Sequence, residues 1–217
     1  MTFLNDVVTY GPGFLSAAWI VLWVTILTIV LSWICGLAAA LAQRSHLYPV
    51  RALAAFYIWF IRGTPALIQI FIVYFGLPQL GIRLSPLTAG VLALGINSGA
   101  YVAEIIRSGL SAIPRGQTES SLALGFSPAQ TMRTIILPQV FRIIIPSMTN
   151  EAISILKNTS LLSTITVVEL TLYAQTLISA TFRPFDFYIA VAVIYLALTS
   201  VLTRLAAWLE HRYRPQS

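Results

Sequence analysis

Two apolar stretches of the sequence carry polar side chains at intervals of three or four residues, which places each set along one face of a helix. The first set consists of Asn97, Tyr101, Glu104 and Ser108. The second set consists of Glu151, Ser154 and Asn158. Polar groups inside an apolar helix are costly unless they face a cavity or a partner group. Two such faces opposed across a helical bundle would line a route for a small hydrogen-bonding solute.

Both sets have an alternative interpretation in which they hold helices together. Any of these side chains could form an interhelical hydrogen bond, and Glu104 could pair with Arg107 one turn later. If Glu104 and Glu151 are ionised and unpaired, they favour a solute with a cationic part. Lys157, Arg107 or protonation could neutralise either carboxylate, so the charge of the solute stays open.

The composition indicates an all-α integral membrane protein. Of the 217 residues, 58% are hydrophobic and 9% are charged, whereas soluble domains carry about a quarter charged residues. The stretches 14–43 and 187–203 contain no charged residue at all. These features exclude a water-soluble domain and a nucleic-acid-binding protein. The single Cys35 excludes an intrachain disulfide and a thiolate metal cluster, and its apolar setting predicts a packing role.

Five segments are long and apolar enough to cross the roughly 30 Å of hydrocarbon as helices, within one transmembrane domain 1–217. They cover about 14–42, 57–82, 86–106, 143–168 and 187–209. Hydropathy alone leaves the fourth segment ambiguous, because Glu151, Lys157 and Asn158 interrupt it.

The distribution of arginines resolves this ambiguity, because basic loops stay in the cytoplasm. Five spans with the N-terminus outside place most arginines at or beyond the inner ends, namely Arg44, Arg51, Arg107, Arg115, Arg133, Arg142, Arg204, Arg212 and Arg214. Only Arg83 and Arg183 fall outside. We therefore expect an extracytoplasmic N-terminus and a cytoplasmic C-terminus, and we interpret the net charge of +6 as a topology signal.

Arg62 complicates the second span, because an arginine at the bilayer centre costs at least about 2.5 kcal/mol. If residues 52–61 form an aromatic stretch at the inner interface, Arg62 can extend to the headgroups and residues 64–82 cross. Gly63, Thr64 and Pro65 would then break or kink the chain at this junction and give it a structural or gating role. The alternative is a kinked helix whose arginine tip faces lipid.

Catalytic and metal-binding patterns were not found in the sequence. The single lysine, Lys157, follows Leu156, so the chain lacks the Gly-Lys pair of a phosphate-binding loop and cannot use that motif to hydrolyse ATP. His46 and His211 stand in basic hydrophilic flanks, where solvated loop residues are expected. We expect no catalytic residue, no metal site and no cofactor in this chain.

Residues 114–138 are polar but keep an apolar periodicity, which predicts two short helices. The first would cover about 117–124 and end at Gly125, because glycine adopts the left-handed conformation most readily. Ser127, Pro128 and Gln130 predict the start of the second helix, with a Ser-x-x-Gln capping box. Pro138 is expected to end it.

This segment resembles the EAA loop of ABC import permeases in both residues and spacing. The first part of the motif begins with Glu119, Ser120 and Ser121 and ends at Gly125. Nine residues later the second part follows, with two isoleucines before Leu137 and Pro138. Serines replace the two alanines of the pattern and keep the side chains small. The polar amino acid branch of the family is similar in three more stretches, 62–65, 97–107 with 116–117, and 156–161.

The resemblance implies a five-helix permease subunit of a bacterial inner-membrane importer for polar amino acids. It implies a second permease subunit, identical or homologous, two ATPase subunits that bind ATP and Mg²⁺, and an extracytoplasmic amino-acid-binding protein. The residues that would couple transport to the ATPase are Glu119, Ser120, Ser121, Gly125, Leu137 and Pro138. A helix pair lying on the membrane surface is the alternative for this segment.

Two other classes of protein compete with this interpretation. A self-contained transporter driven by an ion gradient is disfavoured by the short chain, by the lack of internal repeats and by the elaborate cytoplasmic helix pair. An intramembrane enzyme is disfavoured because no nucleophile with its base is found. The acidic residues of the helix faces favour cationic amino acids or opines within the wider class of polar amino acids.

Overall fold

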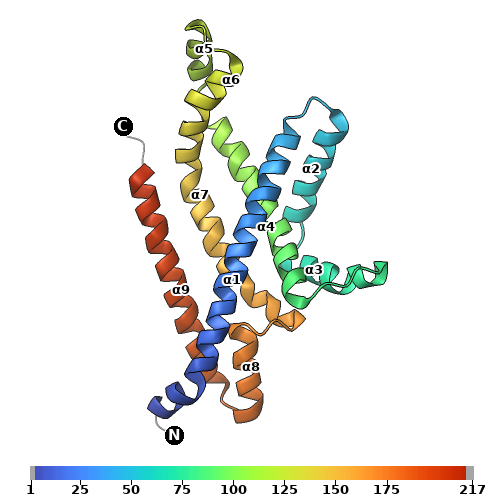
Figure 1. Ribbon diagram of the computed structural model, residues 1–217, viewed down its shortest axis with the longest axis vertical. Coiled ribbons are helices and arrows are strands. Elements are labelled where there is room, and N and C mark those ends of the chain that lie inside the picture. Colours follow the sequence, from blue (N-terminus) through green and yellow to red (C-terminus); the bar gives the residue numbers. More distant parts are fainter. Residues whose placement is uncertain (1–2, 214–217) are drawn as a thin grey trace.

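Helix α1 (Phe3–Gln43) extends along most of the long axis of the molecule and forms one wall of a bundle (Figure 1). The computed structural model describes residues 3–213, and within that range the secondary structure is entirely helical. At 1.5 Å per residue the 41 residues of α1 span about 60 Å, roughly twice the hydrocarbon thickness. The helix is therefore longer than the expected span 14–42 and longer than the hydrocarbon layer is thick.

Helix α4 (Pro86–Ser111) lies at the centre and packs against α1 more extensively than any other element. In the most apolar segment of α4, 61% of the residues are buried, whereas the corresponding share is 11% in α9 (Pro184–Tyr213) at the periphery. Gly95 and Gly99 face Leu31 and Cys35 of α1 so closely that neither position has room for a side chain. The two glycines thus allow the close approach of α1 and α4, and Cys35 packs in this contact.

The second expected span is divided by a sharp bend. Helix α2 (Tyr48–Arg62) ends at Gly63, and Pro65 precedes α3 (Ala66–Phe71), which continues through η1 (Ile72–Gly76) and η2 (Leu77–Leu80). The two parts meet at an angle of 110°. The break predicted at residues 62–65 is confirmed. Residues 52–61 belong to α2, which packs on α1 and α4, and after the break the chain is helical again from Ala66 to Leu80. The placement of residues 52–61 at the inner interface stays a prediction.

The helix pair of residues 114–138 projects from one end of the bundle (Figure 1). It consists of α5 (Arg115–Ala123) and α6 (Pro128–Thr131). The prediction that Pro138 ends the second helix was wrong, because α6 continues through the π-turn η3 (Met132–Ile136) into α7 (Leu137–Asn158). The backbone N–H of Leu137 bonds Met132 O, and this wider turn accommodates the proline, which has no N–H to donate.

The chain after α7 contains a helix that the sequence did not predict. The turn η4 (Thr159–Ile165) ends α7, and α8 (Leu170–Thr181) follows at an angle of 46° before α9 begins. Helices α1, α4 and α9 are each long and apolar enough to span a membrane. Within residues 3–213, counting each bent pair as one span gives up to five candidate spans, which is compatible with the number expected from the arginine distribution.

Candidate functional site

The projecting helix pair is built by local capping interactions. Gly125 has a φ of +84°, the left-handed conformation expected at the end of α5. The Ser127 hydroxyl accepts a hydrogen bond from the Gln130 N–H at 3.3 Å, and the Gln130 side chain accepts one from the Ser127 N–H at 2.8 Å. The predicted capping box is thus confirmed. Both hydrogen bonds join residues three positions apart, so the start of α6 is capped by residues of its own first turn.

A buried pair of hydroxyls holds α5 against α6. Ser121 is 1% exposed, donates to Thr118 O at 2.9 Å and shares a hydrogen bond of 2.9 Å with the Thr131 hydroxyl. Thr131 is buried as well. Ser121 therefore stabilises the pair from within, and its hydroxyl does not face a partner protein.

The outer surface of the pair combines a charge with exposed apolar groups. Glu119 and Ser120 are exposed, and Leu122 and Leu124 are 45% and 77% exposed. Leu137 is also exposed, and Pro138 lies beside it in the first turn of α7. Large apolar side chains on a segment that projects from the bundle indicate a surface that another protein covers.

Gln69 connects the α2–α3 break to the centre of α4. Its amide nitrogen donates to Ile61 O, Thr64 O and the Thr64 hydroxyl at 2.9, 3.2 and 2.7 Å. Its amide oxygen accepts from Asn97 at 3.0 Å, and both amides are buried. These bonds satisfy carbonyl groups that the end of α2 leaves free. Asn97 therefore has a structural contact, and sequence reasoning missed Gln69 because no local pattern marks it.

Arg62 lies next to the polar face of α4 and forms an ion pair there. Its guanidinium lies 3.2 Å from the Glu104 carboxylate and over the Tyr101 ring, 5.6 Å from the ring centre. Arg107 donates two further hydrogen bonds of 2.9 Å to the same carboxylate. Glu104 thus pairs with Arg107, as the alternative interpretation of this set proposed, and also with Arg62, which that interpretation did not name. The guanidinium of Arg62 is directed toward α4, and 44% of its side chain is exposed.

The second polar set lies on α7, where Glu151 and Asn158 are half-buried and Ser154 is exposed. Asn150 and Lys157 are exposed beside them, so a polar strip follows the helix. Ser154 donates to Asn150 O at 3.0 Å. Polar side chains exposed on a membrane helix indicate contact with an aqueous path or another subunit, because lipid cannot solvate them.

The two polar faces do not meet each other within this chain. The α4 face contacts α2 and α3 through Glu104 and Asn97, whereas the Glu151 carboxyl faces Ser98 on a different side of α4. The expectation that they oppose each other across the bundle was therefore wrong. The bent second span accounts for this arrangement, because α2 and α3 pack against the face of α4 that carries Asn97 and Glu104.

A third buried polar group, Glu169, was not predicted as a site residue. It is 1% exposed and caps α8 by accepting hydrogen bonds from the N–H groups of Thr171 and Leu172 at 2.9 and 3.0 Å. Tyr195 of α9 donates to the same carboxylate at 2.9 Å and shares a 3.3 Å hydrogen bond with Thr159. Glutamate is not among the residues preferred at the N-cap, so no local pattern marks this helix start in the sequence.

Comparison with known proteins places this architecture in a family. Residues 29–215 match the family described as "Binding-protein-dependent transport system inner membrane component". The probable amino-acid ABC transporter permease protein YckA of Bacillus subtilis is 42% identical over 82% of this chain and 79% of its own. The glutamine transport system permease protein GlnP of Escherichia coli strain K12 is 38% identical over 94% of both chains.

A solved structure shares both fold and sequence with this chain. The crystal structure of an amino acid ABC transporter with histidines superposes with a TM-score of 0.92 at 40% identity, covering 98% of this chain and 99% of that chain. The chain therefore belongs to the family of inner membrane components of binding-protein-dependent transport systems. It is a membrane-embedded transport component of the permease fold, and the family is not one of enzymes.

Proposed function

We propose that this chain is the permease subunit of an ATP-driven importer for polar amino acids. The observation that carries the proposal is the family membership, together with relatives whose names describe amino-acid and glutamine ABC transporter permeases. The resemblance to an amino acid ABC transporter of known structure supports the same class of substrate. Neither the family nor these relatives support a stand-alone secondary transporter.

The partners follow from what this chain lacks and what it exposes. ATP and Mg²⁺ would bind to two separate ATPase subunits, which would receive the α5–α6 pair through Glu119, Ser120 and the exposed leucines. A second permease copy or homologue would cover the polar strip of α7. An extracytoplasmic binding protein would deliver the substrate at the opposite end, next to α8. This arrangement requires a bacterial cytoplasmic membrane with the N-terminus outside and the α5–α6 pair inside.

Among the acidic residues, Glu151 is the strongest candidate for contact with substrate. Glu104 is already paired with Arg62 and Arg107, so its charge is compensated. Glu151 faces the uncharged Ser98 and lies beside the exposed strip that includes Ser154. A carboxylate in this position favours an amino acid or derivative with a cationic part, such as an opine or a basic amino acid. Tyr101 and Asn158 would contribute to the path through their partly exposed polar groups.

The ion pair and the amide cluster at the α2–α3 break would act as a structural or gating element. Arg62, Gly63, Thr64 and Pro65 form the bend, and Glu104 and Gln69 connect it to α4. If α4 moved relative to the bend, the ion pair and the amide hydrogen bonds would be lost together. We therefore expect the bend and α4 to move as one rigid unit when the transporter opens and closes.

Purification and reconstitution test the proposal. The chain should co-purify with an ATPase and a second permease, and proteoliposomes containing the complex should take up labelled amino acids only with internal ATP and the binding protein. Glutamine, arginine, histidine and an opine should be compared at equal concentration. Uptake by the isolated chain in response to an ion gradient, without ATP, would favour a secondary transporter instead.

A further inference from the structure

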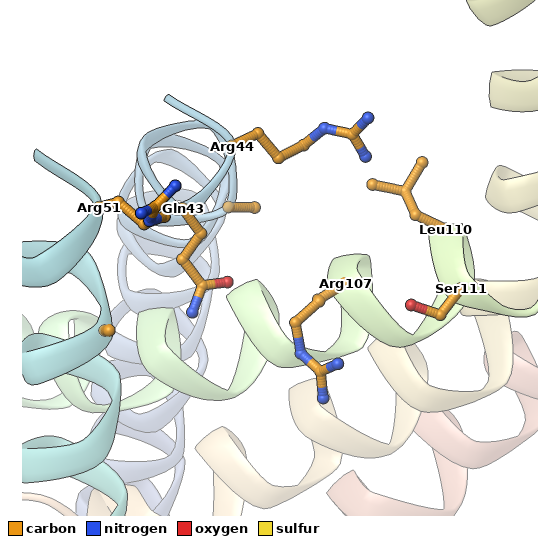
Figure 2. Close-up of a pocket in the computed structure, with 8 residues that line it drawn as sticks. Gln43, Arg44, Arg51, Arg107, Leu110 and Ser111 are labelled. Carbon is orange, nitrogen blue, oxygen red and sulfur yellow. The ribbon is translucent and has the colours of Figure 1, made fainter. Parts of the chain in front are cut away.

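The end of the bundle where α1 finishes and α2 begins contains a basic hollow outside the polar faces described above. Its volume is about 390 Å³. Eight residues line it, namely Ala40, Gln43, Arg44, Arg51, Ala55, Arg107, Leu110 and Ser111. They come from α1, the residue after it, α2 and α4, so the hollow lies between three helices (Figure 2).

The charges around the hollow are unbalanced. Three of the lining residues are arginines and none is a carboxylate. Arg107 is paired with Glu104, whereas Arg51 lies over the Tyr48 ring, 5.7 Å from its centre, and that ring carries no charge. Figure 2 shows Arg44 extending from the end of α1 toward Leu110, with Arg51 on the opposite side of the view. The three guanidinium groups come from different parts of the chain and line one hollow, where each can donate to a phosphate in a bidentate manner.

The surroundings of the hollow place it at a membrane surface. Leu47 and Tyr48, beside Arg51 at the start of α2, are 65% and 71% exposed, and Leu53 is 70% exposed. Apolar and tyrosine side chains exposed next to arginines are typical of the boundary between headgroups and acyl chains. A phosphate that reaches this hollow is therefore most readily supplied by a lipid.

We propose that the hollow binds the headgroup of an anionic phospholipid through Arg44 and Arg51, with Arg107 and Ser111 on its inner wall. The phosphate would be held between the guanidinium groups, and the acyl chains would lie against the exposed apolar side chains of α2. Basic pockets between transmembrane helices are suited to this kind of ligand. The site would connect the ends of three helices, and it is independent of which solute the protein carries.

Native mass spectrometry of the purified transporter complex tests the proposal. After delipidation, the complex is titrated with phosphatidylglycerol or with phosphatidylcholine of the same acyl chains. We expect a preference for phosphatidylglycerol that falls about tenfold to thirtyfold in the Arg44→Gln/Arg51→Gln variant. The Arg204→Gln/Arg212→Gln variant removes the same charge from α9 and should keep the preference. Arg44→Lys/Arg51→Lys keeps the charge but not the bidentate geometry, so its preference should lie between those of the unsubstituted complex and the glutamine variant, which separates loss of charge from misfolding.

Three results would overturn the proposal. Equal binding of the two lipids by the unsubstituted complex would show that the hollow does not recognise an anion. An unchanged preference in the Arg44→Gln/Arg51→Gln variant would place the lipid elsewhere. Displacement of phosphatidylglycerol by millimolar pyrophosphate would identify a site for soluble phosphates and not for lipid.

Discussion

The side-chain amide of Asn97 donates a 3.0 Å hydrogen bond to the amide oxygen of Gln69, and both residues are buried. This bond joins the centre of α4 to the middle of α3, one turn after the 110° bend. The same Gln69 amide satisfies two carbonyl groups near the end of α2. The bend is therefore held by one glutamine that contacts α2, the connecting residues and α4.

Replacing Gln69 with alanine should destabilise the protein by about 1–3 kcal/mol, because buried carbonyl groups and the Asn97 amide lose their partner. Thermal unfolding of the purified complex in detergent measures this effect. Gln79→Ala is a matched control, since Gln79 is exposed on η2. Equal midpoints for the two variants would show that the amide cluster does not hold the bend.

Replacing Gly125 with valine should impair transport while leaving membrane insertion intact. Gly125 has a φ of +84°, which a β-branched residue adopts only with strain, so the turn between α5 and α6 should distort. Gly116→Val is the control, because both glycines have open space around them and only Gly125 has a positive φ. Uptake at equal expression measures the effect. Similar uptake by the two variants would argue against a role for this turn in coupling.

Glu151→Gln should reduce amino-acid uptake roughly tenfold, the loss expected when one charge-assisted contact of about 1.4 kcal/mol disappears. The exchange preserves size and removes the charge. Glu210→Gln is the control, since it makes the same change on α9, where Glu210 accepts a hydrogen bond from Thr149 at 3.1 Å.

Basal ATP hydrolysis distinguishes two roles of Glu151. Normal basal turnover with lost stimulation by substrate indicates contact with the solute, whereas lost basal turnover indicates a structural contact such as the one with Ser98. Normal uptake by Glu151→Gln would remove this residue from the path.

Single-cysteine labelling in a Cys35→Ala background tests the orientation. A membrane-impermeant maleimide should modify Arg83→Cys in intact spheroplasts and should modify His46→Cys only after permeabilisation. This result follows from the arginines that flank the spans. In Figure 1 the chain between α3 and α4 lies at the side of the bundle, well away from the loop between α1 and α2. The reverse pattern would invert the proposed topology.

The sequence was most informative where structure depends on neighbouring residues. The apolar segments, the capping box at Ser127, the left-handed Gly125 and the break after Arg62 each follow from local rules. Pro138 misled the prediction because a π-turn absorbed the proline within a continuous helix. The π-turn is formed by the hydrogen bond from the Leu137 N–H to Met132 O, and no sequence pattern predicts this bond.

Contacts between residues far apart in the sequence could not be predicted from local patterns. Gln69 lies 28 residues from Asn97, and Glu169 lies 26 residues from Tyr195. Helical periodicity placed Asn97 and Glu104 on one face but could not say which element covers that face. The bend of the second span decides it, because it brings α2 and α3 against Glu104 and Asn97.

Stimulated ATP hydrolysis by the reconstituted complex tests the central claim, that this chain forms an amino-acid path driven by a separate ATPase. We expect hydrolysis to rise when the amino-acid-loaded binding protein is added, and the rise to disappear with Glu119→Lys, which reverses a charge on the exposed surface of α5. Glu210→Gln should respond like the unsubstituted complex. Uptake that proceeds without ATP, or hydrolysis that is equally stimulated in the Glu119→Lys complex, would contradict this account.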